Sequence, residues 1–151
     1  PVVVKARKKA RAVTLADAAE GYLRDRDLKP RTAEDVRRQL NGAFAGWKDR
    51  PLVELTREKV ARRFRELSAS APSQANQQFR ILRSILNYSR AAYRLPGDEP
   101  LFAENPVNVL SETRAWNRQR ARNTYVPLDR IGEWWVAVQA GCAAVRWGFP
   151  A

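Results

Sequence analysis

The segment from residue 74 to residue 94 constrains the fold more than any other part of the chain. One row of mainly apolar side chains recurs along it at alternating intervals of four and three residues: Ala75, Phe79, Leu82, Leu86, Ser89 and Tyr93. A second row runs beside the first: Ile81, Ile85, Tyr88 and Ala92. Both spacings follow the period of an α-helix, and a helix with so wide an apolar surface is typical of a protein interior. We therefore predict that residues 74–94 form the central helix of a helical core.

Three earlier segments carry apolar residues at the spacing of amphipathic helices, and each follows a residue type that caps helices. The expected caps are Thr14, Thr32 in a capping box with Asp35, and Thr56; Ser73 is the expected cap of the central helix. The expected helices span residues 15–27, 33–47, 57–67 and 74–94. The sequence thus predicts an all-α fold of four principal helices, with at most a short strand near Tyr125.

Several residue types that enzymes need are absent from the 151 residues. There is no histidine, which excludes imidazole catalysis and imidazole metal sites, and no glycine-rich phosphate loop occurs. The single Cys142 cannot form an intramolecular disulfide, and no apolar run approaches the ~18 residues of a membrane span. We expect a soluble cytoplasmic protein with no membrane contact, no metal, no cofactor and no small-molecule substrate.

The positive charge is concentrated in three stretches that contain no acidic residue. The chain has 28 Lys and Arg against 16 Asp and Glu, a formal charge of +12. The acid-free stretches are residues 1–16, 73–95 and 113–128, and the rest of the chain is close to neutral. Arginines without nearby acids create a potential that attracts polyanions, so nucleic acid is the leading candidate partner. The alternative is that these stretches are solvated surfaces that serve solubility.

A polar stripe lies one residue beyond the first apolar row of the central helix. It consists of Asn76, Arg80, Arg83, Asn87, Arg90 and Arg94, and it contains no carboxylate. Asparagine amides can address base edges, and arginines can address phosphates or guanine edges. The alternative is structural, because arginine stems cover apolar neighbours and cations favour the C-terminal end of a helix.

The remaining segments divide the chain into four parts. We expect a basic tail over residues 1–12, a helical domain over 13–112, a basic linker over 113–127 and a C-terminal segment over 128–151 that contains a linker helix. The linker contributes Arg118, Arg120 and Arg122. The last helix is expected to begin at Leu128 and to end at Gly141, with Trp134 and Trp135 partly exposed.

Several short motifs together resemble the core-binding domain of phage-integrase-type tyrosine recombinases. They are Thr14-Leu-Ala-Asp-Ala-Ala-Glu-Gly-Tyr-Leu, Leu28-Lys-Pro-Arg-Thr, Leu55-Thr-Arg, Ala75-Asn, Arg80 through Leu86-Asn-Tyr, and Asn105-Pro-Val. The resemblance covers residues 12–140 and rests on the order and spacing of motifs that are individually loose. It implies a four-helix, SAM-like bundle that clamps double-stranded DNA and is joined by a linker to a separate catalytic domain. Other recombinase protomers on the DNA are further partners that it implies.

The resemblance also assigns candidate DNA contacts to individual positions. They are Lys29, Arg31 and Thr32 at the start of the second helix, Asn76, Arg80, Arg83, Asn87 and Arg90 on the central helix, and Arg118, Arg120 and Arg122 in the linker. Arg146 does not stand in the family's Thr-Gly-x-Arg context and histidines are absent, so no catalytic residue is carried over. We expect the DNA-binding half of a recombinase, with the catalytic domain missing or truncated and no catalysis by this chain. Two alternatives stay open: a helical RNA-binding domain, and a protein-interaction module that uses Trp134 and Trp135.

Overall fold

The computed structural model describes residue 4, residues 12–119 and residues 125–144, and the chain divides into two compact units, one up to Arg118 and one from Gln119 onward. The described residues are mainly α-helical, which confirms the all-α prediction. Their one regular strand pair is a two-residue hairpin, β1 (Arg94–Leu95) with β2 (Glu99–Pro100), turned by Gly97 at φ +90°. No strand occurs at residues 125–127.

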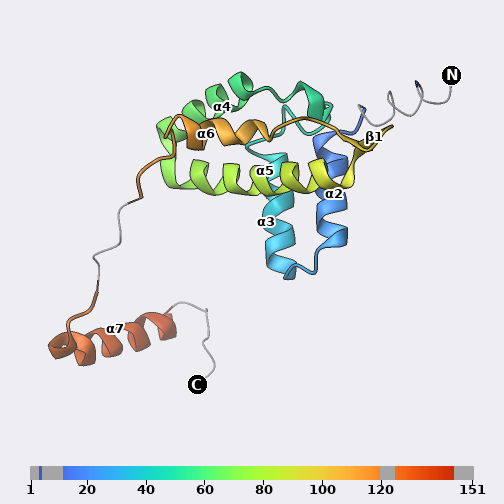
Figure 1. Ribbon diagram of the computed structural model, residues 1–151. Helices are drawn as coiled ribbons and strands as arrows, with labels where there is room; N and C mark the ends of the chain where they lie inside the picture. Colours follow the sequence, from blue (N-terminus) through green and yellow to red (C-terminus); the bar gives the residue numbers. More distant parts are fainter. Residues whose placement is uncertain (1–3, 5–11, 120–124, 145–151) are drawn as a thin grey trace. The chain divides into compact units, whose positions relative to one another are not determined.

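The central helix of the first unit is α5 (Pro72–Ala92), as the sequence predicts. It packs against α2 (Leu15–Asp25) and α4 (Arg57–Ser70), and α2 in turn contacts α3 (Pro30–Asn41). Figure 1 shows α5 running through the middle of this unit, with α4 and α6 (Val109–Glu112) on one side of it. The first apolar row is buried from Ala75 to Ser89, and Phe79 at its centre meets two aromatic rings edge-on, at 5.4 and 5.1 Å between ring centroids.

Two of the four predicted helix caps are confirmed. Thr14 and Asp17 form a reciprocal capping box, in which the Thr14 hydroxyl accepts from the Asp17 N–H at 3.1 Å. Thr56 accepts from the Lys59 N–H at 3.3 Å. The predictions for Thr32 and Ser73 are wrong, because α3 begins at Pro30 and α5 at Pro72. Proline has a helical φ already set and no N–H to satisfy, so it starts both helices upstream of the expected cap.

The second helix is shorter than the predicted 33–47. It ends at Asn41, and residues 42–49 form turns that begin at Gly42. Phe44 is nevertheless buried, and Trp47 stacks on it with ring centroids 5.7 Å apart. The apolar spacing therefore identified the inward-facing residues correctly but extended the helix too far. The chain then passes through a 3-10 turn, η1 (Leu52–Glu54), into α4.

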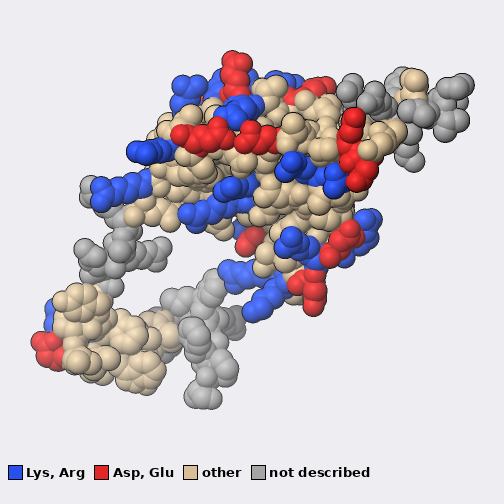
Figure 2. Space-filling view, in the orientation of Figure 1, with Lys and Arg blue, Asp and Glu red and all other residues tan. Residues whose placement is uncertain are grey.

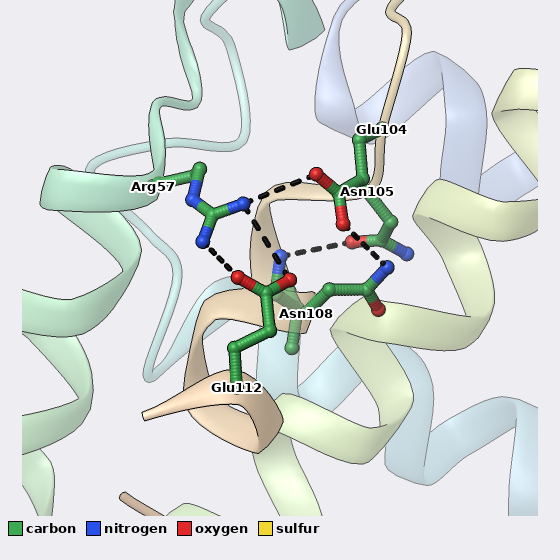
Figure 3. Close-up of polar contacts among 6 residues, drawn as sticks. Arg57, Glu104, Asn105, Asn108 and Glu112 are labelled. Atoms are coloured by element: carbon green, nitrogen blue, oxygen red, sulfur yellow. Dashed lines mark hydrogen bonds and ion pairs between the residues drawn. The ribbon is translucent and has the colours of Figure 1, made fainter. Parts of the chain in front are cut away.

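A polar network fastens the segment after the hairpin to the start of α4 (Figure 3). Arg57 binds Glu104, with 3.1 Å between the Nη1 and Oε2 atoms, and also pairs with Glu112 at the end of α6. Asn108 donates to Glu104 at 3.3 Å from the 3-10 helix η2 (Pro106–Asn108). The hydrogen bond from Asn108, together with Glu112 and Arg57, holds the pKa of Glu104 below its usual value. This network holds η2 and the preceding Asn105 against the bundle.

The first unit extends six residues beyond the expected boundary at 112. Trp116 packs edge-on against Phe64, with ring centroids 5.6 Å apart, and its Nε1 donates to the Ser111 hydroxyl at 2.9 Å. The first part of the expected linker is therefore packed on the bundle.

The second unit contains the 3-10 turn η3 (Leu128–Arg130) and α7 (Ile131–Ala144). The helix continues past its expected end at Gly141, because a glycine inside a helix costs only about 1 kcal/mol and does not end it by itself. Trp134 and Trp135 are 46% and 55% exposed, which confirms the expected partial exposure. None of the described helices is both long and apolar enough to cross a membrane.

Candidate nucleic-acid interface

The arginines of the α5 stripe reach the surface without acidic partners. Arg80 and Arg90 are exposed and Arg83 is half-buried, and none of the three forms an ion pair with another residue of the described chain. In Figure 2, Lys and Arg side chains lie along the region where Figure 1 places α5, whereas acidic side chains gather over α6. The charge pattern of the sequence therefore persists as a surface in three dimensions.

Asn76 does not belong to this surface, which corrects the sequence prediction. It is 1% exposed, and both polar atoms of its amide bind one residue, Asn117. Its Nδ2 donates to the backbone oxygen of Asn117 at 2.8 Å, and its Oδ1 accepts from the Asn117 N–H at 3.1 Å. Because its hydrogen bonds are made inside the protein, Asn76 anchors residues 116–117 to α5 and cannot address a base.

Asn87 is exposed on the stripe, but its oxygen is already in use. The Oδ1 atom accepts a hydrogen bond of 2.7 Å from Nδ2 of Asn105, a residue that is 3% exposed. The Asn105 Nδ2 atom also donates to the backbone oxygen of Arg83 at 2.9 Å. The sequence pattern identified Asn105 only as part of the Asn105-Pro-Val motif. Its contact with α5 joins residues that are 18 positions apart, which helical periodicity does not reveal.

The start of α3 presents Lys29, Arg31 and Thr32 as exposed residues, as expected. The backbone there offers few free N–H groups to an anion. Pro30 has no N–H, and the Thr32 N–H donates to the Lys29 oxygen at 2.8 Å. Among the first three residues of the helix, only the Arg31 N–H is without a partner in the described structure. Side-chain charge, rather than a row of free amides, is what this helix start supplies.

The structure brings one residue of the α3 group and one residue of the α5 stripe to the edge of one hollow. Its volume is about 360 Å³, and its lining includes Thr32 from α3 and Arg80 from α5. Asp35 also borders it, but that carboxylate pairs with Arg38. Thr32 and Arg80, which are 48 positions apart in the sequence, thus line one surface depression, which a single continuous ligand could span.

A second hollow of about 330 Å³ lies further along α5. It is lined by Asn87, Arg90, Ala91, Arg94 and Pro100. Arg94 is partly neutralised, because its Nε lies 3.6 Å from Asp98 Oδ1 and its Nη1 donates to the Asp98 backbone oxygen at 3.1 Å. Arg90 is the cation of this hollow that has no acidic partner within the described chain.

Sequence reasoning missed a third basic hollow, of about 340 Å³, between α4 and the turns after α3. Its cationic lining is Arg50, Lys59, Arg62 and Arg63, beside Trp47. Arg63 is committed to structure, since its Nε and Nη2 both donate to the Ala43 oxygen, at 3.1 and 2.9 Å. These cations alternate with acids along the sequence, so counting acid-free stretches did not reveal them.

The tyrosines of the first unit gather where α2 meets α5. The Tyr88 hydroxyl donates to Asp25, and the Tyr93 hydroxyl donates to the backbone oxygen of Asp17 at 3.3 Å. The hydrogen bond to Asp25 raises the pKa of Tyr88, and burial raises that of Tyr93. Tyr22 meets Tyr88 edge-on, with ring centroids 5.8 Å apart. These three tyrosines therefore lie at the contact between α2 and α5, and Tyr125 is 80% exposed in the second unit.

Of the linker arginines, Arg118 is exposed, and Arg120 and Arg122 lie outside the described residues, as does most of the basic tail. Within the described chain, no cluster of three or more Cys, Asp or Glu side chains is suited to hold a metal ion. No protein-family model, no curated protein and no solved structure matches the chain.

Proposed function

We propose that the first unit binds double-stranded DNA and serves as the core-binding domain of a site-specific tyrosine recombinase, positioning that enzyme at its recombination site for DNA integration. The observation that carries the proposal is the set of Arg80, Arg83 and Arg90 on α5, which have no acidic partner in the described chain. The resemblance of the sequence motifs to that family supports the more specific part. A SAM-like bundle and a cytoplasmic, nucleoid-associated location belong to the same proposal.

The dimensions of the stripe suit a DNA groove. Residues 80 to 90 of α5 span about 15 Å at 1.5 Å per residue, which is the length of about four to five base pairs. The major groove is about 12 Å wide and admits an α-helix. One helix can therefore place all three guanidinium groups on phosphates or guanine edges at once.

The start of α3 would hold the neighbouring backbone. Lys29 and Arg31 are exposed there, and Thr32 shares a hollow with Arg80 of the stripe. Phosphate contacts fix the register of a protein on the duplex, while contacts to base edges specify sequence. We assign Lys29 and Arg31 to phosphates, together with Arg118, Arg120 and Arg122 along the linker. The chain supplies binding and positioning, and the chemistry belongs to a separate catalytic domain.

Two charge-matched variants test the proposal. R80Q/R83Q removes two cations from the stripe and keeps their stems, and K8Q/K9Q removes two cations from the tail. A bound duplex is first selected from a random 30-base-pair pool, and dissociation constants for this duplex and a scrambled one are measured over a salt series. We expect R80Q/R83Q to lose preference for the selected duplex, at about 1–3 kcal/mol for each bidentate base contact removed. K8Q/K9Q should weaken both duplexes equally and reduce the salt slope.

Three results would contradict the proposal. Equal behaviour of the two variants would leave only nonspecific electrostatic binding. Tighter binding of a structured RNA hairpin than of the duplex at equal salt would favour the RNA-binding alternative. No binding of either nucleic acid at physiological salt would favour the protein-interaction alternative. Far-UV circular dichroism of each variant controls for loss of the helical fold.

A further inference from the structure

The orientation of the Asn105 amide is fixed by two backbone groups. The Val107 N–H can only donate, and it donates to Asn105 Oδ1 at 3.0 Å (Figure 3). The Arg83 carbonyl can only accept, and it accepts from Asn105 Nδ2 at 2.9 Å. The nitrogen of Asn105 therefore faces α5 and its oxygen faces η2, and exchanging the two atoms would break both bonds.

This orientation determines the polarity of Asn87. The second hydrogen on Asn105 Nδ2 lies toward Asn87 at 2.7 Å, so the atom of Asn87 that meets it must be the acceptor, Oδ1. The Asn87 NH₂ group is the other end of the amide, and it has no partner in the described structure. Asn87 is exposed and borders the hollow of about 330 Å³ with Arg90 and Arg94. Every polar side chain that lines this hollow therefore presents hydrogen-bond donors.

We propose that Asn105 is a positioning residue that fixes Asn87 as a hydrogen-bond donor, so that the hollow of Asn87, Arg90 and Arg94 takes a group of DNA that only accepts. Such groups are a phosphate oxygen or the O6 and N7 edge of guanine. An asparagine that reads adenine uses its oxygen and its nitrogen together, on N6 and N7. With the oxygen held by Asn105, Asn87 does not read adenine. This inference rests on the proposed function, and it changes the role first assigned to the asparagines of the stripe.

The geometry is tested on the free protein, without DNA. In ¹⁵N-labelled protein, the side-chain NH₂ of Asn105 should exchange slowly with solvent and show a hydrogen-bond scalar coupling to the Arg83 carbonyl. The NH₂ of Asn87 should exchange rapidly. Protection of the Asn87 amide instead of the Asn105 amide would overturn the proposal, whatever the protein binds.

The role in binding is tested with N87A and N105D on the selected duplex. The carboxylate that N105D introduces still accepts from the Val107 N–H but cannot donate, so Asn87 would turn its nitrogen inward and present its oxygen to the hollow. Each variant should weaken binding about three- to tenfold, the range of one hydrogen bond. In an N87A background, N105D should cause no further loss, because Asn105 acts through Asn87. Equal losses from N105D in both backgrounds would show a merely structural role and overturn the proposal.

A second variant covers the case in which N105D does not fold. N87D keeps the acceptor for Asn105 but puts a carboxylate oxygen in place of the outward NH₂, so it should bind more weakly than N87A. The exposed Asn41 on α3 supplies the control N41A, which should bind like wild type. Binding by N87D or N87A equal to wild type would overturn the inference alone, whereas no duplex binding by wild type would overturn the proposed function as well.

Modified duplexes distinguish the two acceptor groups. If the acceptor is a phosphate, one methylphosphonate substitution should reduce wild-type binding and leave N87A unaffected. If the acceptor is guanine, one guanine-to-adenine change should reduce wild-type binding and leave N87A binding unaffected. A wild-type preference for adenine that N87A abolishes would contradict the donor-only assignment.

Discussion

Replacing Gly21 with alanine tests the closest approach between α2 and α5. A Cβ atom at position 21 would lie 2.7 Å from the Tyr93 hydroxyl oxygen and 3.1 Å from that of Tyr88. Contacts below 3.0 Å force a rearrangement, and Gly21 is buried within α2. Helix propensity and steric crowding therefore act in opposite directions at this position.

The free energies involved indicate that steric crowding outweighs helix propensity. Alanine in a helix interior gains about 1 kcal/mol over glycine. Overpacking a filled site costs about 1–3 kcal/mol, and displacing a phenol that donates a hydrogen bond costs about 1 kcal/mol more. Both phenols are held, Tyr88 by Asp25 and Tyr93 by the Asp17 carbonyl. We expect G21A to lower the free energy of unfolding by about 1–3 kcal/mol, which lowers Tm by roughly 4 °C per kcal/mol for a unit of this size.

Y93F supplies the matched background, because it removes the oxygen at 2.7 Å and keeps the ring. In Y93F the closest remaining oxygen is that of Tyr88 at 3.1 Å, so G21A should be neutral or stabilise by up to about 1 kcal/mol. The double-mutant cycle should therefore give a coupling of at least about 1 kcal/mol. The assay is urea unfolding followed by far-UV circular dichroism, with the slope m compared among all four proteins.

One result would refute this reasoning. If G21A raises stability by the same amount in wild type and in Y93F, the phenols move aside without cost, and glycine is not required for the packing of α2 on α5.

Three further predictions concern titration and the unit boundary. The raised pKa values of Tyr88 and Tyr93 mean that the folded protein favours the protonated phenols, so these phenols stabilise the fold below pH 10.0 and this stabilisation is lost as the pH rises further. In urea unfolding from pH 8 to 11.5, Y88F should reduce the loss of stability with pH. The lowered pKa of Glu104 has the opposite effect: the Glu104 carboxylate stabilises the fold above pH 4.5, and this stabilisation is lost as the pH falls. R57Q should reduce this pH dependence in thermal unfolding from pH 3 to 6. W116A should lower the free energy of unfolding by about 2 kcal/mol, because it removes the contact with Phe64, and an unchanged urea midpoint would restore the boundary at 112.

The sequence was sufficient to predict the core of the first unit. The burial of α5 from Ala75 to Leu86 follows directly from the 4-3 spacing of its apolar residues, because that spacing is a local property of one helix. Thr14 and Thr56 were predictable caps for the same reason. Where a proline competed with a threonine or serine, as before α3 and α5, two local signals conflicted, and periodicity had no means to rank them.

The candidate site was predictable only in part, because the surface of α5 is decided by contacts that are distant in sequence. Asn76, Arg80 and Arg83 lie along one line at helical spacing, yet Asn76 is covered by residues 41 positions further along the chain. No property of residues 73–95 indicates where the segment after α6 passes. Charge segregation predicted the surface better, because a guanidinium without a nearby acid is costly to bury and stays at the surface.

Two asparagines outside α5 shape what the stripe presents. Asn117 binds Asn76, the first residue of the stripe, in the interior of the protein. Asn105 donates a hydrogen bond to the amide oxygen of Asn87. The stripe that the sequence suggests, a mixture of amides and guanidiniums able to read several bases, is thereby reduced to a surface that donates. A donor surface binds phosphates and guanine edges. It does not recognise adenine through paired contacts from an amide oxygen and nitrogen. Sequence preference, if α5 lies in a groove, must then come from guanine positions and from the shape of the duplex, and arginine substitutions should alter it more than asparagine substitutions do.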